Sequence, residues 1–408
     1  MESVRIKING AFWDSQIYSG ELILFAEDGS LRRLDWRAFI DGLADAYGNI
    51  RTALRVSFID GELFYNDKVR KILLDPEIAK PIRDQLKRLA SEDLWVDNHR
   101  GEKVSSPFDF VPTDTEVYYN NIIASGNEGL YSCSRTNIGR RDSYLFAEKH
   151  HDARFLQVKA SDRHTAVAAA AGSDGLIEFG FEKDGGEARL EGEKHLSTRP
   201  CSACEWAFQN VVGWTDGSAF LANFNEEKKR GSLDSYRIFD RVIDFSEIFG
   251  AEKNASGRSF SWGSREKFYR VDGDEIIVVE RKGKTGSKNK KASESSGEFE
   301  KIGSLQTGFD GAEILATGTA PFGSVVELKD RLVVVRSDGK VEEFFGELVH
   351  WRIFPRSSHY SNQIHLIYED HMEVVSFVHD YFVGQLDKNF GFSRNSDSFS
   401  EEVQSAFL

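Results

Sequence analysis

Short runs of alternating apolar and polar residues recur along the chain, and an Asp-Gly pair separates the two halves of most of them. A clear example is NVVGWTDGSAFLANF, which extends from Asn210 to Phe224 and has its Asp-Gly pair at Asp216 and Gly217. The β-branched and aromatic residues on both sides suit a pleated, buried surface. An Asp-Gly pair tolerates positive φ at both central positions and reverses the chain in register. The pattern therefore predicts a β-hairpin.

The same hairpin pattern occurs at six further places. Its turns are expected at Asp28, Asp60, Asp174, Asp272, Asp338 and Asp370, the last with His371 in the place of glycine. Supersecondary units repeated along a chain stack or form a ring, and a four-stranded blade of a β-propeller takes about 40 to 45 residues. About 330 residues remain once helical and loop segments are set aside, which predicts about seven blades, within a range of six to eight. The expected fold class is all-β, a single β-propeller domain over residues 1–408.

The ring also needs a complete set of blades and a closing sheet. One interval between successive turns is 114 residues long, so the strands of a further blade are expected near residues 127–146. Closure of the ring places the first and last strands in one sheet, because it removes edges that would otherwise aggregate. Residues 4–8 or 21–27 are therefore expected to pair with residues near 373–378.

Two segments in the N-terminal quarter have helical rather than strand periodicity. Residues 37–48 place apolar side chains at helical spacing behind Asp35, which is a candidate N-cap. Residues 75–90 carry a second apolar stripe, in which Pro81 fits only if the regular helix begins there. We expect both segments to be short helical insertions in the propeller.

Polar segments, overall charge and the absence of targeting patterns restrict the flexible regions, binding partners and cellular location that we expect. Residues 281–298 lack large apolar side chains and are expected to form a flexible Lys/Ser-rich loop, and residues 385–408 a polar C-terminal tail. The net charge of −14 makes this an acidic protein and disfavours nucleic-acid binding by its whole surface. The sequence has no signal-peptide pattern and no apolar run of roughly 18 to 20 residues. With three cysteines only, a cytoplasmic protein without membrane contact is expected.

The motifs of common enzymes are absent from the sequence. No GxSxG, HExxH or GxGxxG occurs, and the GKTGSK at Gly283 lacks the glycine that a phosphate-binding loop needs, because position 278 is Val. Cys201 and Cys204 form a CxxC without the second pair of a zinc site. We expect no catalytic residue, no metal and no cofactor, and we expect that the protein is not an enzyme.

Basic residues gather in three places against the acidic background. Arginine side chains suit carboxylate or phosphate recognition, and aromatic residues interleaved with them can stack bases. The candidate ligand- or partner-binding residues are Arg135, Arg140, Arg141, Arg352, Arg356, Trp351 and Tyr360. The basic loop adds Lys282, Lys284, Lys288, Lys290 and Lys291. The alternative interpretation is that the aromatic residues belong to the core and that the basic residues are solvated loop charges.

With its repeated hairpins the chain resembles the β-propeller repeat proteins, in the broad sense of the WD40 and kelch-like proteins. The resemblance implies a rigid disc with a central channel and faces built from loops, a form used chiefly to bind partners. We therefore expect a non-catalytic scaffold that mediates protein–protein interaction within a multi-subunit assembly. One alternative is a propeller that binds or acts on a small anionic or nucleotide-like ligand through loop arginines near the channel. A further alternative is nucleic-acid contact through the basic loops.

Overall fold

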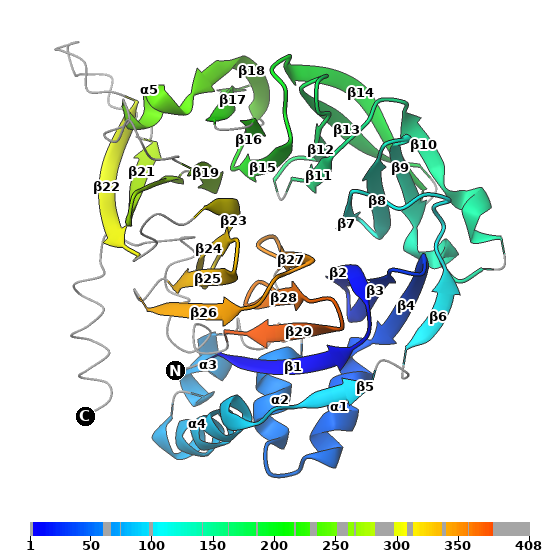
Figure 1. Cartoon of the computed structure of the whole chain (residues 1–408), viewed down its shortest axis with the longest axis vertical. Helices are drawn as coiled ribbons and strands as arrows, with labels where there is room; N and C mark the ends of the chain where they lie inside the picture. Colours follow the sequence, from blue (N-terminus) through cyan, green and yellow to red (C-terminus); the bar gives the residue numbers. More distant parts are fainter. Residues whose placement is uncertain are drawn as a thin grey trace.

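The strands of the chain form seven sheets arranged in a ring (Figure 1). The computed structural model describes residues 3–59, 67–73, 75–97, 101–140, 142–161, 163–184, 187–215, 218–228, 235–250, 260–264, 267–281, 298–307, 313–336, 340–357 and 359–377. Six sheets have four strands and the seventh has five. The protein is therefore a seven-bladed β-propeller, as the sequence predicted.

In each of the first six blades the strands run in chain order from the innermost to the outermost, and in blade 1 a long insertion separates the last two strands. Blade 1 consists of β2 (Phe12–Tyr18), β3 (Glu21–Ala26), β4 (Ser30–Asp35) and β6 (Glu102–Ser105). Blade 2 consists of β7 (Asp114–Tyr118), β8 (Asn121–Gly126), β9 (Gly129–Ser134) and β10 (Glu148–His151). Blade 3 consists of β11 (Gln157–Ala160), β12 (Ala166–Ala170), β13 (Leu176–Asp184) and β14 (Glu187–Ser197).

The second half of the ring repeats this order. Blade 4 consists of β15 (Ala203–Ala207), β16 (Asn210–Thr215), β17 (Ser218–Lys228) and β18 (Ser235–Asp244), followed by the short helix α5 (Phe245–Phe249). Blade 5 consists of β19 (Phe260–Ser264), β20 (Lys267–Asp272), β21 (Glu275–Arg281) and β22 (Phe299–Gln306). Blade 6 consists of β23 (Ile314–Ala320), β24 (Gly323–Leu328), β25 (Arg331–Arg336) and β26 (Val341–Phe345).

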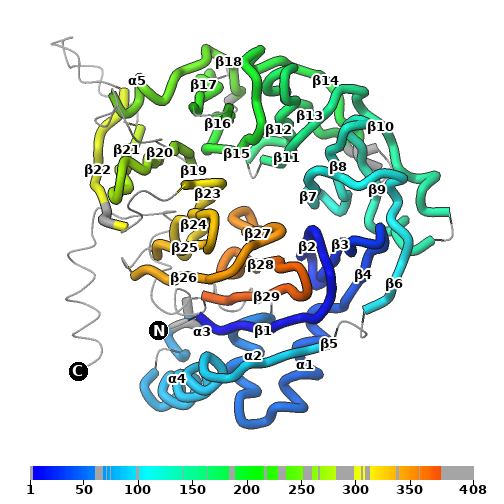
Figure 2. The backbone as a smooth tube through the Cα atoms, viewed as in Figure 1, coloured from blue at the N-terminus to red at the C-terminus, as the bar shows by residue number. Residues whose placement is uncertain are grey.

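Blade 7 closes the ring by combining both ends of the described chain. Its strands β27 (His350–Ile353), β28 (Gln363–Ile367) and β29 (His371–Ser376) are joined by β1 (Val4–Asn9) and then by β5 (Trp95–Asp97). The trace in Figure 2 shows the blue β1 beside the orange-red β29. β1 and β29 are antiparallel, and their register runs from Val4 opposite Ser376 to Asn9 opposite His371. The expected pairing of residues 4–8 is confirmed, and the alternative with residues 21–27 is not, because these form β3 and the turn after it.

A helical insertion between β4 and β6 packs on the outer side of blade 7. It contains α1 (Trp36–Ala46), α2 (Arg51–Phe58), α3 (Asp67–Leu73) and α4 (Pro76–Ser91). Asp35 caps α1 by accepting a hydrogen bond from the backbone N–H of Ala38 at 2.9 Å, as the sequence suggested. The helix over residues 75–90 is present too, but it begins at Pro76 and not at Pro81. Asp75 caps this earlier start, so Pro81 lies inside the helix near its N-terminus, where its missing N–H leaves one backbone hydrogen bond unmade.

The hairpin predicted at Asp60 is wrong. The residues before this turn form helix α2, in which Ala53, Leu54 and Phe58 are buried against the other helices and blade 7. The apolar spacing of this segment is compatible with a β-strand and with an α-helix, and the tertiary packing favours the helix. The other six predicted hairpins have strands on both sides of the turn, and β9 supplies the strand expected within residues 127–146.

The backbone of the described Asp-Gly turns differs from the expected one in detail. Positive φ occurs at Gly29, Gly175 and Gly273, but not at the aspartate that precedes each of them. At Gly175 the glycine is required, because a Cβ there would lie 2.0 Å from the carbonyl oxygen of Ser197. The glycine alone therefore supplies the unusual backbone conformation in these turns.

We expect that the substitution Ile6→Ala in β1 weakens the closing sheet. Ile6 is fully buried and lies opposite Val374 of β29, so its truncation should lower the free energy of unfolding by about 2 to 5 kcal/mol. Urea denaturation measures the change. Ile72→Ala is the matched control, because this side chain is 57% exposed, and it should change stability by less than about 0.5 kcal/mol. Equal effects of the two substitutions would contradict a structural role for β1.

Candidate functional site

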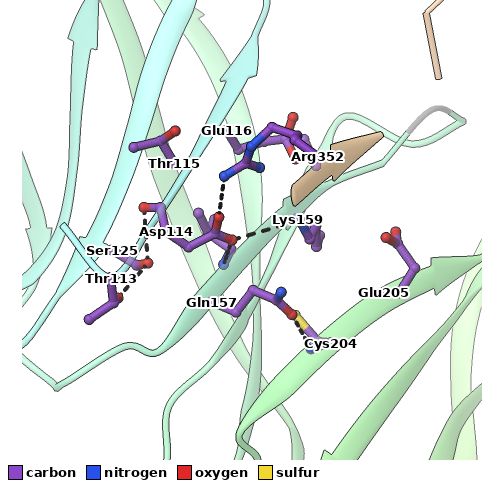
Figure 3. Close-up of polar contacts among 12 residues, drawn as sticks. Thr113, Asp114, Thr115, Glu116, Ser125, Gln157, Lys159, Cys204, Glu205 and Arg352 are labelled. Atoms are coloured by element: carbon purple, nitrogen blue, oxygen red, sulfur yellow. Dashed lines mark hydrogen bonds and ion pairs between the residues drawn. The ribbon is translucent and has the colours of Figure 1, made fainter. Parts of the chain in front are cut away.

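Charged side chains are concentrated on innermost strands of the ring. Figure 1 shows these strands around the propeller axis, and Figure 3 shows several of the side chains. The set comes from β2, β7, β11, β15, β27 and the loop after β27. We call it the axial cluster, and its members are Asp14, Asp114, Glu116, Lys159, Glu205, Arg352 and Arg356. The innermost strands of blades 5 and 6, β19 and β23, carry only apolar or small residues, so the cluster is confined to the other five blades.

Arg352 on β27 holds the buried part of the axial cluster together. Its Nε donates to Asp14 Oδ1 at 2.7 Å, and its Nη2 donates to Asp14 Oδ2 at 2.8 Å and to Asp114 Oδ1 at 2.7 Å. All three side chains are 5% exposed or less. We call this arrangement the Arg352 clamp. It connects blade 7 with blades 1 and 2 by charge-assisted hydrogen bonds in a site of low dielectric.

Neighbouring groups complete the hydrogen bonding of the Arg352 clamp. Thr115 Oγ1 donates to Asp14 Oδ2 at 2.5 Å, and the backbone N–H of Val158 donates to Asp114 Oδ2 at 3.1 Å. Burial by itself would raise the pKa of Asp114, but the charges of Lys159 and Arg352 outweigh it and hold this pKa below its ordinary value. The Asp114 carboxylate therefore stays ionised although it is buried.

The remaining members of the axial cluster are more accessible to solvent. Arg356 forms an ion pair with Glu116 and donates a hydrogen bond to the carbonyl oxygen of Ala160. The Lys159 ammonium lies 3.8 Å from Asp114 Oδ2. The side chains of Lys159 and Arg356 are 20% and 25% exposed, and Glu205 on the next strand is half-buried. Figure 3 shows Glu205 on β15 beside Lys159 on β11, with no interaction drawn between them.

Two histidines adjoin the Arg352 clamp, and both are held in the neutral form. His365 lies opposite Arg352 in β28 and is fully buried, with its Nδ1 2.8 Å from Ser15 Oγ. Burial and the nearby Arg352 charge lower the pKa of His365 to about 3. His350 Nε2 lies 3.7 Å from Asp14 Oδ1, and burial lowers the pKa of His350 to about 4. Neither histidine therefore adds positive charge to the site at neutral pH.

Of the residues that the sequence singled out, Arg352 and Arg356 are brought together at the axis. Trp351 is next to Arg352 on β27, but its side chain and that of Tyr360 make their contacts outside the axial cluster. Trp351 Nε1 donates to Glu327 Oε2 at 2.8 Å, and its ring packs against the core of blades 6 and 7. Tyr360 is 1% exposed and its hydroxyl accepts a hydrogen bond from the backbone N–H of Gly20 at 2.9 Å.

The arginines of the other candidate loop lie away from the axial cluster. Arg135 bonds to Glu21 through Nη2 at 2.5 Å, and its guanidinium lies 4.9 Å from the ring centre of Tyr18, so it connects blades 2 and 1. Arg140 is exposed and lies 5.6 Å from the ring centre of Phe146. Arg141, Lys282, Lys284, Lys288, Lys290 and Lys291 lie outside the described residues.

The sequence interpretation missed the other five members of the axial cluster, which are Asp14, Asp114, Glu116, Lys159 and Glu205. A weak signal for them exists, since each is a charged residue inside or at the edge of a short apolar strand, as in QVKA and ACEWA. That signal does not tell which charges meet, because the partners of Arg352 are 338 and 238 residues away along the chain.

The cysteines do not form a reactive or metal-binding site in the described part of the chain. Cys133, Cys201 and Cys204 are free and buried. Burial raises the pKa of Cys133 to about 11 and that of Cys201 to about 12, so that both thiols stay protonated at neutral pH. Within the described residues, no three His, Cys, Asp or Glu side chains are grouped so that they could hold a metal ion.

Comparison with known proteins finds likeness in structure only. No protein-family model matches the chain. No curated protein matches it by sequence. Among solved structures, it is similar to the WD40 β-propeller domain of Doa1, with 8% identity, a TM-score of 0.48, and coverage of 92% of this chain and 95% of that one. It is also similar to the β-propeller domain of Myceliophteria thermophila Cps50 (Swd1), with 11% identity, a TM-score of 0.47, and coverage of 92% and 98%.

The class of the protein follows from the sheet topology itself. Seven sheets with the same strand order, closed by β1 in the last sheet, define a β-propeller. The resemblance inferred from the repeated hairpins is thus confirmed for the fold. In the part of the chain that is described, no helix is long and apolar enough to cross a membrane.

Removal of the positive charge from the Arg352 clamp should destabilise the propeller strongly. Arg352→Met leaves Asp14 and Asp114 buried without their counter-charge, and we expect a loss of about 3 to 5 kcal/mol in the free energy of unfolding. Urea denaturation at neutral pH measures the loss. The exposed Arg140 provides the control, since Arg140→Met should change stability by less than about 0.5 kcal/mol. A loss below about 1 kcal/mol for Arg352→Met would show that the clamp is dispensable.

Stability should fall as the pH is lowered from about 6.5 towards 4. The native pKa of His365, about 3, lies below its value of about 6.5 in the unfolded chain, so the unfolded state binds more protons in this range. By pH 4 His365 contributes a loss of about 3 kcal/mol, which grows to about 5 kcal/mol below its native pKa. His365→Asn should flatten the pH dependence of unfolding measured by urea titration. A variant with the same pH slope as the original protein would contradict this assignment.

Proposed function

We propose that this protein is a non-catalytic β-propeller scaffold that binds a protein partner, within a multi-subunit assembly. The observation that carries the proposal is an apolar segment in the connection between β9 and β10. The 3₁₀-helix η3 (Arg135–Asn137) and a second one, η4 (Ser143–Phe146), lie in this connection. In η4, Tyr144, Leu145 and Phe146 are 59%, 67% and 38% exposed.

Exposure of three consecutive large apolar side chains to water is unfavourable in free energy unless another surface covers them. Full burial of one such side chain contributes roughly 1.5 to 3 kcal/mol, which is why exposed apolar groups of this kind mark interaction sites. We call Tyr144, Leu145 and Phe146 the rim segment. It lies in the loop at the outer side of blade 2 (Figure 1), where a partner can approach without disturbing the blades.

The rim segment also has the composition of a binding site. Tyrosine and arginine are the residues that dominate binding energy at protein interfaces. The exposed Arg140, which was among the sequence candidates, lies over the ring of Phe146 and places a positive charge at the edge of the apolar side chains. This arrangement of apolar anchors with a charged margin is typical of protein–protein contacts.

The axial cluster supports a binding function rather than a catalytic one. A catalytic acid, base or nucleophile must reach a substrate, whereas Asp14, Asp114 and Arg352 are buried and bonded to one another. The two other functions considered from the sequence have less support. Arg352 and Arg356, which would bind a small anion, are both paired with carboxylates, and the basic loop proposed for nucleic acid lies outside the described residues.

Replacement of the rim segment should abolish partner binding without affecting the fold. The triple variant Tyr144→Ser, Leu145→Ser and Phe146→Ser removes the exposed apolar anchors, and we expect at least a tenfold, or about 1.4 kcal/mol, weaker association. The measurement is affinity capture of the tagged protein from its own cells, with quantitative mass spectrometry of the bound proteins. Circular dichroism checks the fold of each variant.

A matched control comes from blade 6, where three other large apolar residues are exposed to a similar degree. The variant Leu315→Ser, Val341→Ser and Phe345→Ser removes side chains that are 50%, 42% and 68% exposed. It should retain the stoichiometric partner that the rim variant loses. The proposal fails if the rim variant keeps that partner, or if the original protein captures no stoichiometric protein at all.

A further inference from the structure

The charges of the axial cluster do not balance. The cluster has four carboxylates, from Asp14, Asp114, Glu116 and Glu205, but only three cationic side chains, from Lys159, Arg352 and Arg356. The neighbouring His350 does not make up the difference, because partial burial and the Arg352 charge lower its pKa. The cluster therefore has one carboxylate more than it has cationic side chains.

The excess negative charge is best assigned to Glu205. Arg352 is shared by Asp14 and Asp114, and Arg356 is paired with Glu116. Within the described residues, the Glu205 carboxylate accepts one hydrogen bond, at 2.8 Å from the backbone N–H of Trp206, and it has no side-chain donor. Burial is the largest influence on the pKa of Glu205 and raises it, and the charges of Lys159 and Arg356 offset this rise only in part.

Glu205 lies in the accessible part of the cluster. The Arg352 clamp is 5% exposed or less, whereas Glu205 is half-buried and the adjacent Lys159 and Arg356 side chains are 20% and 25% exposed. A group from solvent can therefore reach Glu205 without breaking the clamp. In Figure 3 the Glu205 carboxylate points away from the strand that carries it.

We propose that the axial cluster binds a cationic group, an ammonium or a guanidinium, through Glu205. A cation there completes the hydrogen bonding of a half-buried carboxylate and neutralises the excess charge of the cluster. An anion is disfavoured at the same place, because it meets the Glu205 charge and finds both arginines already paired. The site differs in charge from the anion site that the arginines suggested in the sequence, and it is independent of the rim segment.

An ammonium group that binds Glu205 can belong to a free amine or to the lysine side chain of a protein. Isothermal titration calorimetry at neutral pH and low ionic strength distinguishes them with two probes. The first probe is butylammonium, and the second is a pentapeptide, Ala-Ala-Lys-Ala-Ala, blocked at both ends. Saturable binding of butylammonium at least as tight as that of the peptide supports a free amine. Tighter binding of the peptide supports a lysine presented by a protein. Inorganic phosphate is the probe of opposite charge and should give no saturable heat.

Two substitutions with opposite expected effects test the assignment to Glu205. Glu205→Gln removes the excess charge and should weaken binding of the tighter probe by about tenfold or more. Lys159→Gln removes a competing cation and should tighten binding of that probe by about threefold or more. Loss of structure lowers affinity in every variant, so tighter binding by Lys159→Gln cannot arise from misfolding. Glu347→Gln, at an exposed glutamate outside the cluster, is the control and should bind as the original protein does.

Three results would overturn the proposal. One is the absence of saturable heat with both cationic probes. Another is binding of phosphate in their place. The third is unchanged affinity in a folded Glu205→Gln variant together with unchanged or weaker binding by Lys159→Gln. None of these results bears on the rim segment, whose test uses different residues and a different readout.

Discussion

The contact of one arginine with two buried aspartates connects the end of the ring to its beginning. Arg352 belongs to blade 7, Asp14 to blade 1 and Asp114 to blade 2, so the clamp spans the point where the propeller closes. A buried ion pair gains little over apolar packing of the same shape, but the loss of one partner leaves an unpaired charge inside the protein. The three residues therefore depend on one another, and this fixes how the innermost strands of these blades meet.

The same closure is reinforced at the outer side of blade 7. β1 pairs with β29, β5 extends the sheet beyond β1, and the helical insertion packs on the result. Polar contacts join the end of α2 to this blade, since Ser376 Oγ donates to the carbonyl oxygen of Ser57 at 2.7 Å. Trp36 Nε1 donates to the carbonyl oxygen of Phe58 at 2.6 Å and so fixes the same end of α2 to α1. The insertion thus covers the strands on which closure depends, and the rim segment on blade 2 remains exposed to solvent.

Local sequence signals predicted the propeller well, because its hairpins are local structures. An apolar run, an Asp-Gly pair and a second apolar run lie within about 15 residues, so the strands on both sides of Asp28, Asp174 and Asp272 could be identified directly. The Asp60 copy failed because the pattern before it suits a helix as well, and only burial of Leu54 and Phe58 against α1 and α4 decides between them. The closure rule alone predicted that a first strand pairs with the last one, and it left residues 4–8 and residues 21–27 as alternatives, since no local signal connects the two ends. That residues 1–408 form one single domain remains a prediction.

The candidate site was far less predictable, because its geometry depends on residues distant in sequence. Arg352 could be selected for its aromatic neighbours, but its role could not, since the aspartates that pair with it lie on β2 and β7. Glu205 carries no motif, and its importance follows from the absence of a side-chain hydrogen-bond donor to it among the residues that the structure describes. The pattern of charges along a strand identifies candidates, whereas the three-dimensional pairing decides which of them remain available to a ligand.

The central claim is that Arg352 and Asp114 act as one unit across the closure of the ring, and a double-mutant cycle tests it most directly. The free energy of unfolding is measured in urea for Arg352→Met, for Asp114→Asn and for the two combined. The account predicts an interaction energy of about 1.5 kcal/mol or more, because either single substitution already disrupts the same buried pair. Additive effects, within about 0.5 kcal/mol, would contradict it and show that closure depends on the sheet pairing of β1 and β29 alone.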